Sequence, residues 1–271
     1  MHTVTPLHKP ATGPAPIVAL HSSGASGRQW DAYRALLPAA TQLLTPALAG
    51  YETEAAWPNG SPVTLQAEAR RLLPLLVAQG RPVHLVGHSY GGAVALQTAL
   101  LWPEHVRSLT LYEPVLFHLL FADAQSTELG QQVTSVGRRI ALLALSGRNE
   151  EAAALFVGYW SGDAAWARLP MARRLAVMAR MSKVRAEFEA LFAARFEVGP
   201  LAATRIPVRL VGGTRSPAPA QRVTELLARQ LPQAERITIE GAVHMSPVTD
   251  PETLAPHLFP AHTAPAFAQA A

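Results

Sequence analysis

Short runs of Val, Ile and Leu recur along the chain, and stretches with helical spacing separate them. The runs do not alternate with polar residues, which is typical of strands covered on both faces of a parallel sheet. The pattern therefore predicts an α/β fold with a mostly parallel sheet and crossover helices. The predicted strands are Ile17–Leu20, Gln42–Pro46, Val83–Val86, Ser108–Leu111, Val208–Val211 and Arg236–Ile239.

Helical spacing is clearest over Thr64–Ala78, Ala93–Leu101 and Gln221–Leu231. The rhythm changes between Pro114 and about Thr204, where four helical stretches occur and no strand-like run. These four are Thr127–Leu145, Glu150–Trp160, Met171–Met181 and Val184–Phe196. We expect residues 1–113 and 205–262 to form the sheet domain, residues 114–204 an inserted all-helical cap, and residues 263–271 a disordered tail.

Composition narrows the function classes. Hydrophobic residues make up 49% of the 271 residues and charged residues 15%, which excludes a disordered chain. A net charge of +4 is too small and too dispersed to favour a nucleic-acid partner. The chain has no cysteine, and no scattered His, Asp or Glu shows metal-ligand spacing, so neither a metal nor a cofactor is predicted. Without a signal-peptide pattern or a long apolar run, we expect a cytoplasmic protein with no membrane partner.

One motif carries chemistry. The predicted strand Val83–Val86 leads directly into Gly87-His88-Ser89-Tyr90-Gly91, a G-x-S-x-G pattern followed by a helix. A sharp strand-to-helix turn strains the serine backbone and presents its hydroxyl at the carboxyl edge of the sheet. A Cβ at either flanking glycine would crowd the turn or the neighbouring strand. The N–H after the serine is then free to bind an oxyanion.

Two further segments complete a candidate site. The first strand ends in small residues, His21-Ser22-Ser23-Gly24-Ala25-Ser26-Gly27, a loop whose backbone can approach a reacting carbonyl closely. After the last strand, His244 lies on a loop that can reach the same sheet edge. Neutral imidazole near pH 7 is a suitable base for a serine hydroxyl.

These motifs, in this chain order and with a helical insertion, resemble the α/β-hydrolase superfamily over nearly the whole chain. The resemblance implies that Ser89 is the nucleophile and His244 the base. It also implies that the backbone N–H groups of Ser23 and Tyr90 form the oxyanion hole. The chain departs from the family where His-Gly is usual, because it has His21-Ser22.

The acid of the triad is the second departure. The family most often places an Asp after the strand that corresponds to Val208–Val211, but the loop here is Gly212-Gly213-Thr214-Arg215-Ser216-Pro217, with Ser216 at the expected position. Some members carry the acid one strand earlier, which maps onto Glu113. We predict Glu113 as the third member and rank Asp250 below it, since Asp250 would have to double back to reach His244.

A serine with a paired base favours carboxylic-ester hydrolysis through an acyl-enzyme, on small to medium acyl groups. Carbon–carbon bond hydrolysis, perhydrolysis, acyl transfer, and a slow or non-catalytic ligand-binding protein remain alternatives. The cap predicts a buried apolar pocket for a small-molecule ester, and Phe117, Trp160 and Trp166 are candidate walls. Aromatic residues at such helical positions are, however, more often simply part of the helix-packing core. The sequence leaves the oligomeric state open.

Overall fold

A computed structural model describes residues 14–51 and 62–260 of the chain. Its centre is a sheet of six parallel strands in the order β2-β1-β3-β4-β5-β6. The strands are β1 (Ile17–Leu20), β2 (Leu43–Leu44), β3 (Val83–His88), β4 (Val106–Tyr112), β5 (Val208–Gly213) and β6 (Glu235–Ile239). All six predicted strands are confirmed, with β2 shorter and β3, β4, β5 and β6 longer than the predicted runs.

The sheet separates two hydrophobic cores. Successive side chains of a strand point to opposite faces, and β1 shows this directly. Val18 and Leu20 belong to the larger core, whereas Ile17 and Ala19 belong to the smaller one. Burial on both faces explains why the inner strands β1, β3, β4 and β5 appear as continuous apolar runs in the sequence, whereas the edge strand β6 is only partly buried.

Helices cover both faces of the sheet. The helices α2 (Leu65–Ala78) and α3 (Tyr90–Leu101) pack together on one face, and α3 also contacts β1, β3 and β4. On the other face α1 (Tyr33–Leu36) packs with α13 (Pro251–Leu258), which contacts β4. The remaining helices of this part are the 3-10 segments η1 (Gly27–Trp30) and η3 (Pro103–His105), together with α11 (Ala218–Gln230) and α12 (Ser246–Thr249).

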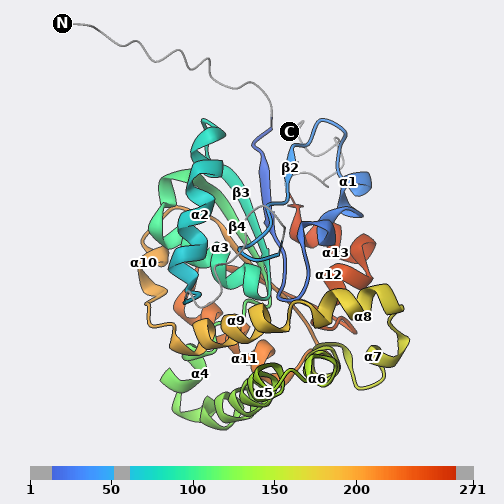
Figure 1. Cartoon of the computed structure of the whole chain (residues 1–271). Helices are drawn as coiled ribbons and strands as arrows, with labels where there is room; N and C mark the ends of the chain where they lie inside the picture. The colour runs from blue at the N-terminus through green and yellow to red at the C-terminus, as the bar shows by residue number, and fades with distance from the viewer. Residues whose placement is uncertain (1–13, 52–61, 261–271) are drawn as a thin grey trace, which may run out of the picture.

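The secondary structure that the chain forms between β4 and β5 consists of helices joined by turns and loops, and we call this segment the cap. It contains α4 (His118–Ala122), η4 (Ala124–Ser126), α5 (Thr127–Leu145), α6 (Asn149–Ser161), α7 (Ala165–Arg168), α8 (Met171–Met178), α9 (Met181–Ala193) and α10 (Gly199–Ala202). Most of these helices gather at one end of the sheet, below it in Figure 1 and opposite the N-terminus. The domain boundaries stay predictions, and residues 263–271 lie outside the described part of the chain.

Several helix boundaries differ from the predictions. The predicted Gln221–Leu231 and Val184–Phe196 each begin three residues earlier, as α11 (Ala218–Gln230) and α9 (Met181–Ala193). Two further differences have clearer structural consequences. Met171–Met181 is not one helix, because α8 ends at Met178 and α9 already begins at Met181, with a turn between them that no Gly or Pro marks. The second difference is at α3, which begins at Tyr90 rather than at Ala93. The helix therefore starts within the G-x-S-x-G motif, so that its first N–H groups lie beside Ser89.

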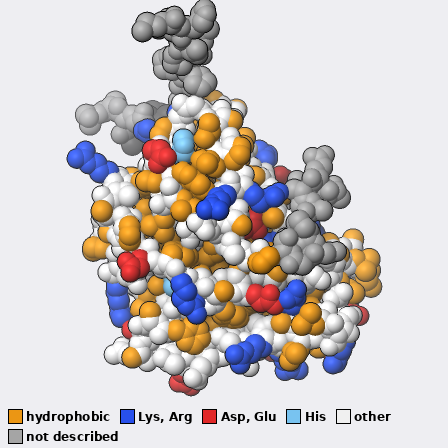
Figure 2. All heavy atoms as spheres, turned by 60° about the vertical axis from the view of Figure 1, so that its left-hand side comes forward, with side chains coloured by type: hydrophobic (Ala, Val, Ile, Leu, Met, Phe, Trp, Pro, Cys, Tyr) orange, Lys and Arg blue, Asp and Glu red, His pale blue; other side chains and the backbone are white. Residues whose placement is uncertain are grey.

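Charged side chains are dispersed on the face that Figure 2 shows. Lys and Arg side chains lie singly or in small groups there, among hydrophobic and acidic ones. No described helix is long and apolar enough to cross a membrane.

Candidate active site

Ser89 lies at the junction of β3 and α3 with a backbone φ of 55°, a value that non-glycine residues rarely adopt. The two glycines of the motif make this turn possible, as predicted. A Cβ on Gly87 would lie 2.5 Å from the carbonyl oxygen of Gly91, and one on Gly91 would lie 2.5 Å from those of Leu20 and His21. Both distances are far inside van der Waals contact, so these sites exclude other residues.

The structure brings Ser89, His244 and Glu113 together. Ser89 Oγ lies 2.9 Å from His244 Nε2, and His244 Nδ1 lies 2.7 Å from Glu113 Oε2. Because a carboxylate only accepts, Nδ1 must carry a proton, and in the tautomer with its single proton there Nε2 is free to accept from the serine hydroxyl. The three side chains come from segments after β3, β6 and β4, whose carboxyl ends meet at one edge of the sheet.

Glu113 is held in place by the loop that lacks the usual acid. Its Oε1 accepts a hydrogen bond of 2.7 Å from the backbone N–H of Gly213, at the end of β5. Glu113 itself has a φ of 42°, so its backbone is strained like that of Ser89. A Cβ on Gly213 would lie 2.1 Å from the carbonyl oxygen of Ala242, on the loop that carries His244. The glycines after β5 therefore give Glu113 a donor and let the His244 loop approach.

The other two candidate positions for the acid have different surroundings. Asp250 caps α13, where its carboxylate accepts from the N–H of Thr253. The hydroxyl of Ser216 is buried, and no hydrogen-bond partner occurs for it among the described residues. Of the three positions, the structure brings only Glu113 to His244.

Two backbone N–H groups are available near the hydroxyl. In the loop after β1, Gln29 Oε1 accepts from the N–H of Ser22 and Tyr51 Oη accepts from that of Gly24. No described acceptor takes the N–H of Ser23, which lies between them. The N–H of Tyr90, the first residue of α3, likewise has no intrahelical partner. Both predicted oxyanion donors are thus unpaired within the described ranges.

Two side chains, Gln29 and His88, join these segments through hydrogen bonds that could not be predicted from the sequence. Gln29 accepts from both the N–H and the hydroxyl of Ser22, and its amide donates to His88 Nδ1 at 3.1 Å. His88 Nε2 donates in turn to the carbonyl of His244 at 2.8 Å. Burial holds the pKa of the His88 ring well below its ordinary value, so the ring stays neutral and keeps this one-donor, one-acceptor arrangement. Only the place of His88 inside the motif could have drawn attention to it.

The predicted pocket residues fall in different surroundings. Trp160, on α6, stacks on the His244 imidazole, with 4.0 Å between ring centroids and 28° between planes. Phe117 is fully buried and packs against Phe188 and Phe192, and Trp166 is partly buried with the Arg174 guanidinium 5.6 Å from its ring centre. Only Trp160 is in contact with the candidate site. The pocket roles of Phe117 and Trp166 stay predictions.

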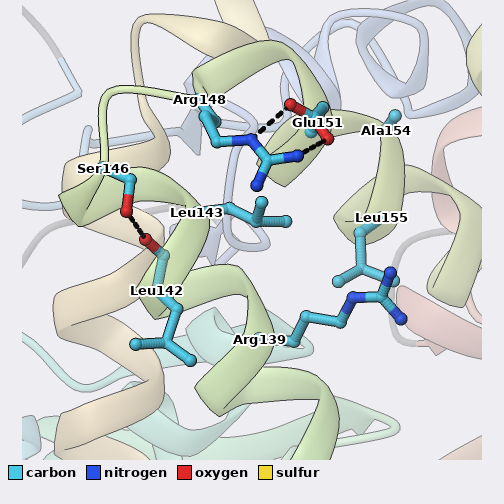
Figure 3. Close-up of a pocket in the computed structure, with 8 residues that line it drawn as sticks. All are labelled: Arg139, Leu142, Leu143, Ser146, Arg148, Glu151, Ala154 and Leu155. Carbon is cyan, nitrogen blue, oxygen red and sulfur yellow. Dashed lines mark hydrogen bonds and ion pairs between the residues drawn. The ribbon is translucent and has the colours of Figure 1, made fainter.

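The candidate site is closed in this structure. Ser89 is 4% exposed, His244 1% and Glu113 0%. The cavity in Figure 3, of about 470 Å³, lies elsewhere, between α5 and α6, and the ion pair of Arg148 with Glu151 is at its edge. None of the predicted site residues lines it. Among residues 14–51 and 62–260, no group of three or more His, Asp or Glu side chains is placed to hold a metal ion.

Comparisons with known proteins agree with this architecture. Residues 17–257 match the model of the alpha/beta hydrolase family, so the chain belongs to that family. A lipase of Mycobacterium tuberculosis, LipV, is 36% identical over 106 residues, which span 39% of each protein. The membership and this relative support a hydrolase.

Solved structures of similar fold include a hydrolase from Pseudomonas aeruginosa, with a TM-score of 0.71 and 25% identity over 89% of this chain and 87% of that one. An enol-lactonase from Burkholderia xenovorans has a TM-score of 0.70 and 19% identity over 90% and 89%. A thermophilic esterase from Thermogutta terrifontis has a TM-score of 0.66 and 22% identity over 89% and 87%. The last two, at these identities, show the fold alone.

Proposed function

We propose that this alpha/beta hydrolase is a serine esterase that cleaves carboxylic esters through an acyl-enzyme. One observation carries the proposal: the continuous path from Ser89 Oγ to His244 Nε2, and from His244 Nδ1 to Glu113 Oε2, with distances of 2.9 and 2.7 Å. A hydroxyl on a strained turn, a neutral imidazole and a buried carboxylate are the parts that acyl transfer requires.

The reaction follows from these contacts. Ser89 Oγ forms a bond to the ester carbonyl carbon while its proton passes to His244 Nε2, and the carbonyl oxygen becomes an oxyanion. The N–H groups of Ser23 and Tyr90 stabilise that oxyanion. The carbon–oxygen bond to the leaving alcohol then breaks as His244 returns the proton to the alcohol. Water repeats the sequence on the acyl-enzyme, which releases the acid and restores Ser89.

Glu113 acts on the charge that forms on His244. When the imidazole accepts the serine proton it becomes a cation, and the carboxylate 2.7 Å away stabilises it and keeps the ring oriented. The Gly213 N–H holds the second carboxylate oxygen, so the carboxylate is fixed from both sides. The stacked Trp160 ring adds a further favourable contact with the cation.

The substrate lies under the cap. Side chains of α6 surround the site: Trp160 stacks on His244, and the Phe156 ring lies 3.0 Å from where a Cβ on Gly24 would be. These apolar walls favour small to medium acyl groups. Since Ser89 is almost fully buried, cap side chains must move to admit a substrate.

A chain-length series of p-nitrophenyl esters tests this function. We expect steady hydrolysis of short and medium esters, and a loss of about 10⁴-fold or more in kcat for Ser89→Ala. The matched control is Ser216→Ala, another buried serine near the same sheet edge, which should keep its activity. A fluorophosphonate should label the wild type once, at Ser89 by peptide mass spectrometry.

Two results would contradict the proposal. Release of one alcohol per protein followed by almost no turnover would favour a ligand-binding protein on a hydrolase fold. Equal activity of wild type and Ser89→Ala would remove the serine from the chemistry altogether. Added alcohols separate hydrolysis from acyl transfer, because an acyltransferase would form mainly the new ester.

A further inference from the structure

In the loop after β1, residues of the sheet domain orient the peptide that joins Ser22 to Ser23. His21 Nδ1 donates to the carbonyl of Ser22 at 2.8 Å, while His21 Nε2 accepts from the N–H of Leu48 at 3.1 Å. A trans peptide is planar, so fixing the Ser22 carbonyl fixes the Ser23 N–H in the opposite direction. The direction of this proposed oxyanion donor is therefore set on one side by His21.

The next residue of the loop is held by the cap. Arg180, at the start of α9, donates to the carbonyl of Gly24 at 2.8 Å. Tyr51 Oη accepts from the N–H of Gly24 at 2.8 Å and donates to Glu187, on α9, at 2.8 Å. The Arg180 guanidinium also lies 5.6 Å from the centre of the Tyr51 ring. Both peptides that flank Gly24 are thus bonded to α9, directly or through Tyr51.

Behind this contact is a buried group of charges that joins α9 to α2. Lys183 Nζ lies 2.7 Å from Glu68 and 3.2 Å from Glu187, and all three side chains are less than 5% exposed. Burial raises the pKa of the Glu187 carboxyl, and Lys183, the Ser23 hydroxyl and Tyr51 oppose that rise. Glu187, on the cap helix α9, therefore contacts Ser23 of the loop after β1 and also Tyr51, which bonds to Gly24 of that loop.

A contribution to stability alone would not explain why Glu68, Lys183 and Glu187 are buried together. Removing three charged side chains from water is costly, and apolar residues of similar volume often serve the fold as well or better. What apolar residues cannot do is orient the two peptides of Gly24, which needs a donor, an acceptor and a charge to anchor Tyr51. The position of the group, beside the loop and between cap and sheet domain, is the observation that needs explaining.

We propose that α9 of the cap positions the loop after β1 (residues 21–27), which carries the proposed oxyanion donor, the Ser23 N–H. The positioning residues are Arg180 and the connected series Tyr51, Glu187 and Lys183. This inference rests on the proposed esterase function and adds a role that the helical insertion plays in the chemistry. None of these side chains touches the reacting atoms. They act through the backbone of Ser23 and Gly24, so the cap and the oxyanion donor are mechanically coupled.

Arg180→Met and Tyr51→Phe test the proposal, because each removes polar contacts to Gly24 and leaves most of the side-chain volume. A displaced donor weakens binding of the tetrahedral intermediate more than binding of the ester. We therefore expect kcat to fall about 10- to 100-fold with little change in KM. The inhibition constant of an alkyl boronic acid, which forms a tetrahedral anion on the serine, should rise in parallel.

The controls separate positioning from simple packing. Arg185→Met removes another arginine of the same helix, one that pairs with Glu189 at the surface, and should leave kcat unchanged. Arg180→Lys keeps one charged donor for the Gly24 carbonyl and should recover part of kcat. Hydrogen exchange of a peptide covering residues 21–27 should accelerate in Arg180→Met and Tyr51→Phe but not in Arg185→Met.

The outcomes distinguish this inference from the function on which it rests. If the wild type shows Ser89-dependent hydrolysis and both folded variants keep their kcat and boronate affinity, α9 does not position the loop and the inference is wrong. If Ser89-dependent hydrolysis is missing in the wild type, the proposed function fails and the inference fails with it. Should Arg180→Met unfold at the assay temperature, Tyr51→Phe, which removes only a hydroxyl, decides between these outcomes.

Discussion

Two buried groups of acids and bases lie close to one another in this protein, and their charges are balanced differently. In the first, Glu113 faces the His244 imidazole and a backbone N–H, and in the proposed reaction a cation forms beside the carboxylate when His244 takes the serine proton. In the second, Lys183 already lies between Glu68 and Glu187. In the proposed reaction the first group gains stabilisation, whereas the second gains none. This difference suits the first to chemistry and the second to holding the structure.

The largest expected effect is on kcat and comes from a substitution in the first group. Glu113→Gln keeps the shape of the side chain but removes the charge that stabilises imidazolium, so we expect kcat to fall by roughly two to four orders of magnitude. Circular dichroism and thermal unfolding should show a folded protein. Asp250→Asn is the matched control: it alters the cap of α13 and should cost about 1 kcal/mol of stability or less, without loss of kcat. The reverse result would make Asp250 the acid.

The next largest effect is on the free energy of unfolding and comes from a substitution in the second group. Lys183→Met leaves two buried carboxylates without their counterion, and we expect the free energy of unfolding to fall by about 3–5 kcal/mol in urea titrations. The exposed pair of Arg185 and Glu189 provides the comparison, since Arg185→Met should cost about 1 kcal/mol at most. Similar losses for the two variants would show that the buried charges do not stabilise the fold.

A smaller effect sharpens the role of the cap beside His244. Trp160→Leu removes the ring stacked on the imidazole, and a cation–π contact of about 0.5–2 kcal/mol corresponds to a roughly two- to thirtyfold fall in kcat. Trp166→Leu serves as the comparison, because the sequence predicts a pocket role for both tryptophans and only Trp160 contacts the site. A larger fall in kcat for Trp166→Leu would contradict this assignment.

The smallest effect concerns pH and the loop before Ser23. Burial lowers the pKa of His21 to about 4, so between pH 6.5 and 4 the unfolded chain binds a proton at this ring that the folded protein does not. The free energy of unfolding therefore falls as the pH falls through this window, by at most about 1.4 kcal/mol per pH unit from this group. His21→Asn, which keeps a donor near the position of Nδ1, should have a shallower slope in urea titrations between pH 6.5 and 5. The raised pKa of Glu187 acts in the opposite sense in both proteins, so the difference between their slopes isolates His21. An unchanged slope would show that this ring does not titrate as its burial implies.

The six strands, the turn at Ser89 and the placement of His244 at the same sheet edge could be predicted because each depends on local signals. Apolar runs mark the strands, glycines mark the turn at Ser89, and parallel strands bring their carboxyl ends to one edge. Glu113 could be predicted only through the resemblance to hydrolases that carry the acid one strand earlier. The contacts of Gln29 with His88, and of Lys183 with Glu68, could not be predicted. Both join segments far apart in the chain, and single polar residues in a helical pattern read as solvated positions until tertiary packing buries them.

The position of Glu113 after β4 means that the loop after β5 does not have to supply the acid. Because the carboxylate follows β4, the end of β5 contributes one backbone N–H, that of Gly213, to Glu113 and no side chain. Of residues 214–217, Arg215 is the exposed one, whereas the backbone N–H groups of Thr214 and Arg215 donate to the segment that leads to His244. A fluorescent label attached to the side chain at position 215 would therefore report on the rim of the site and leave these backbone contacts in place.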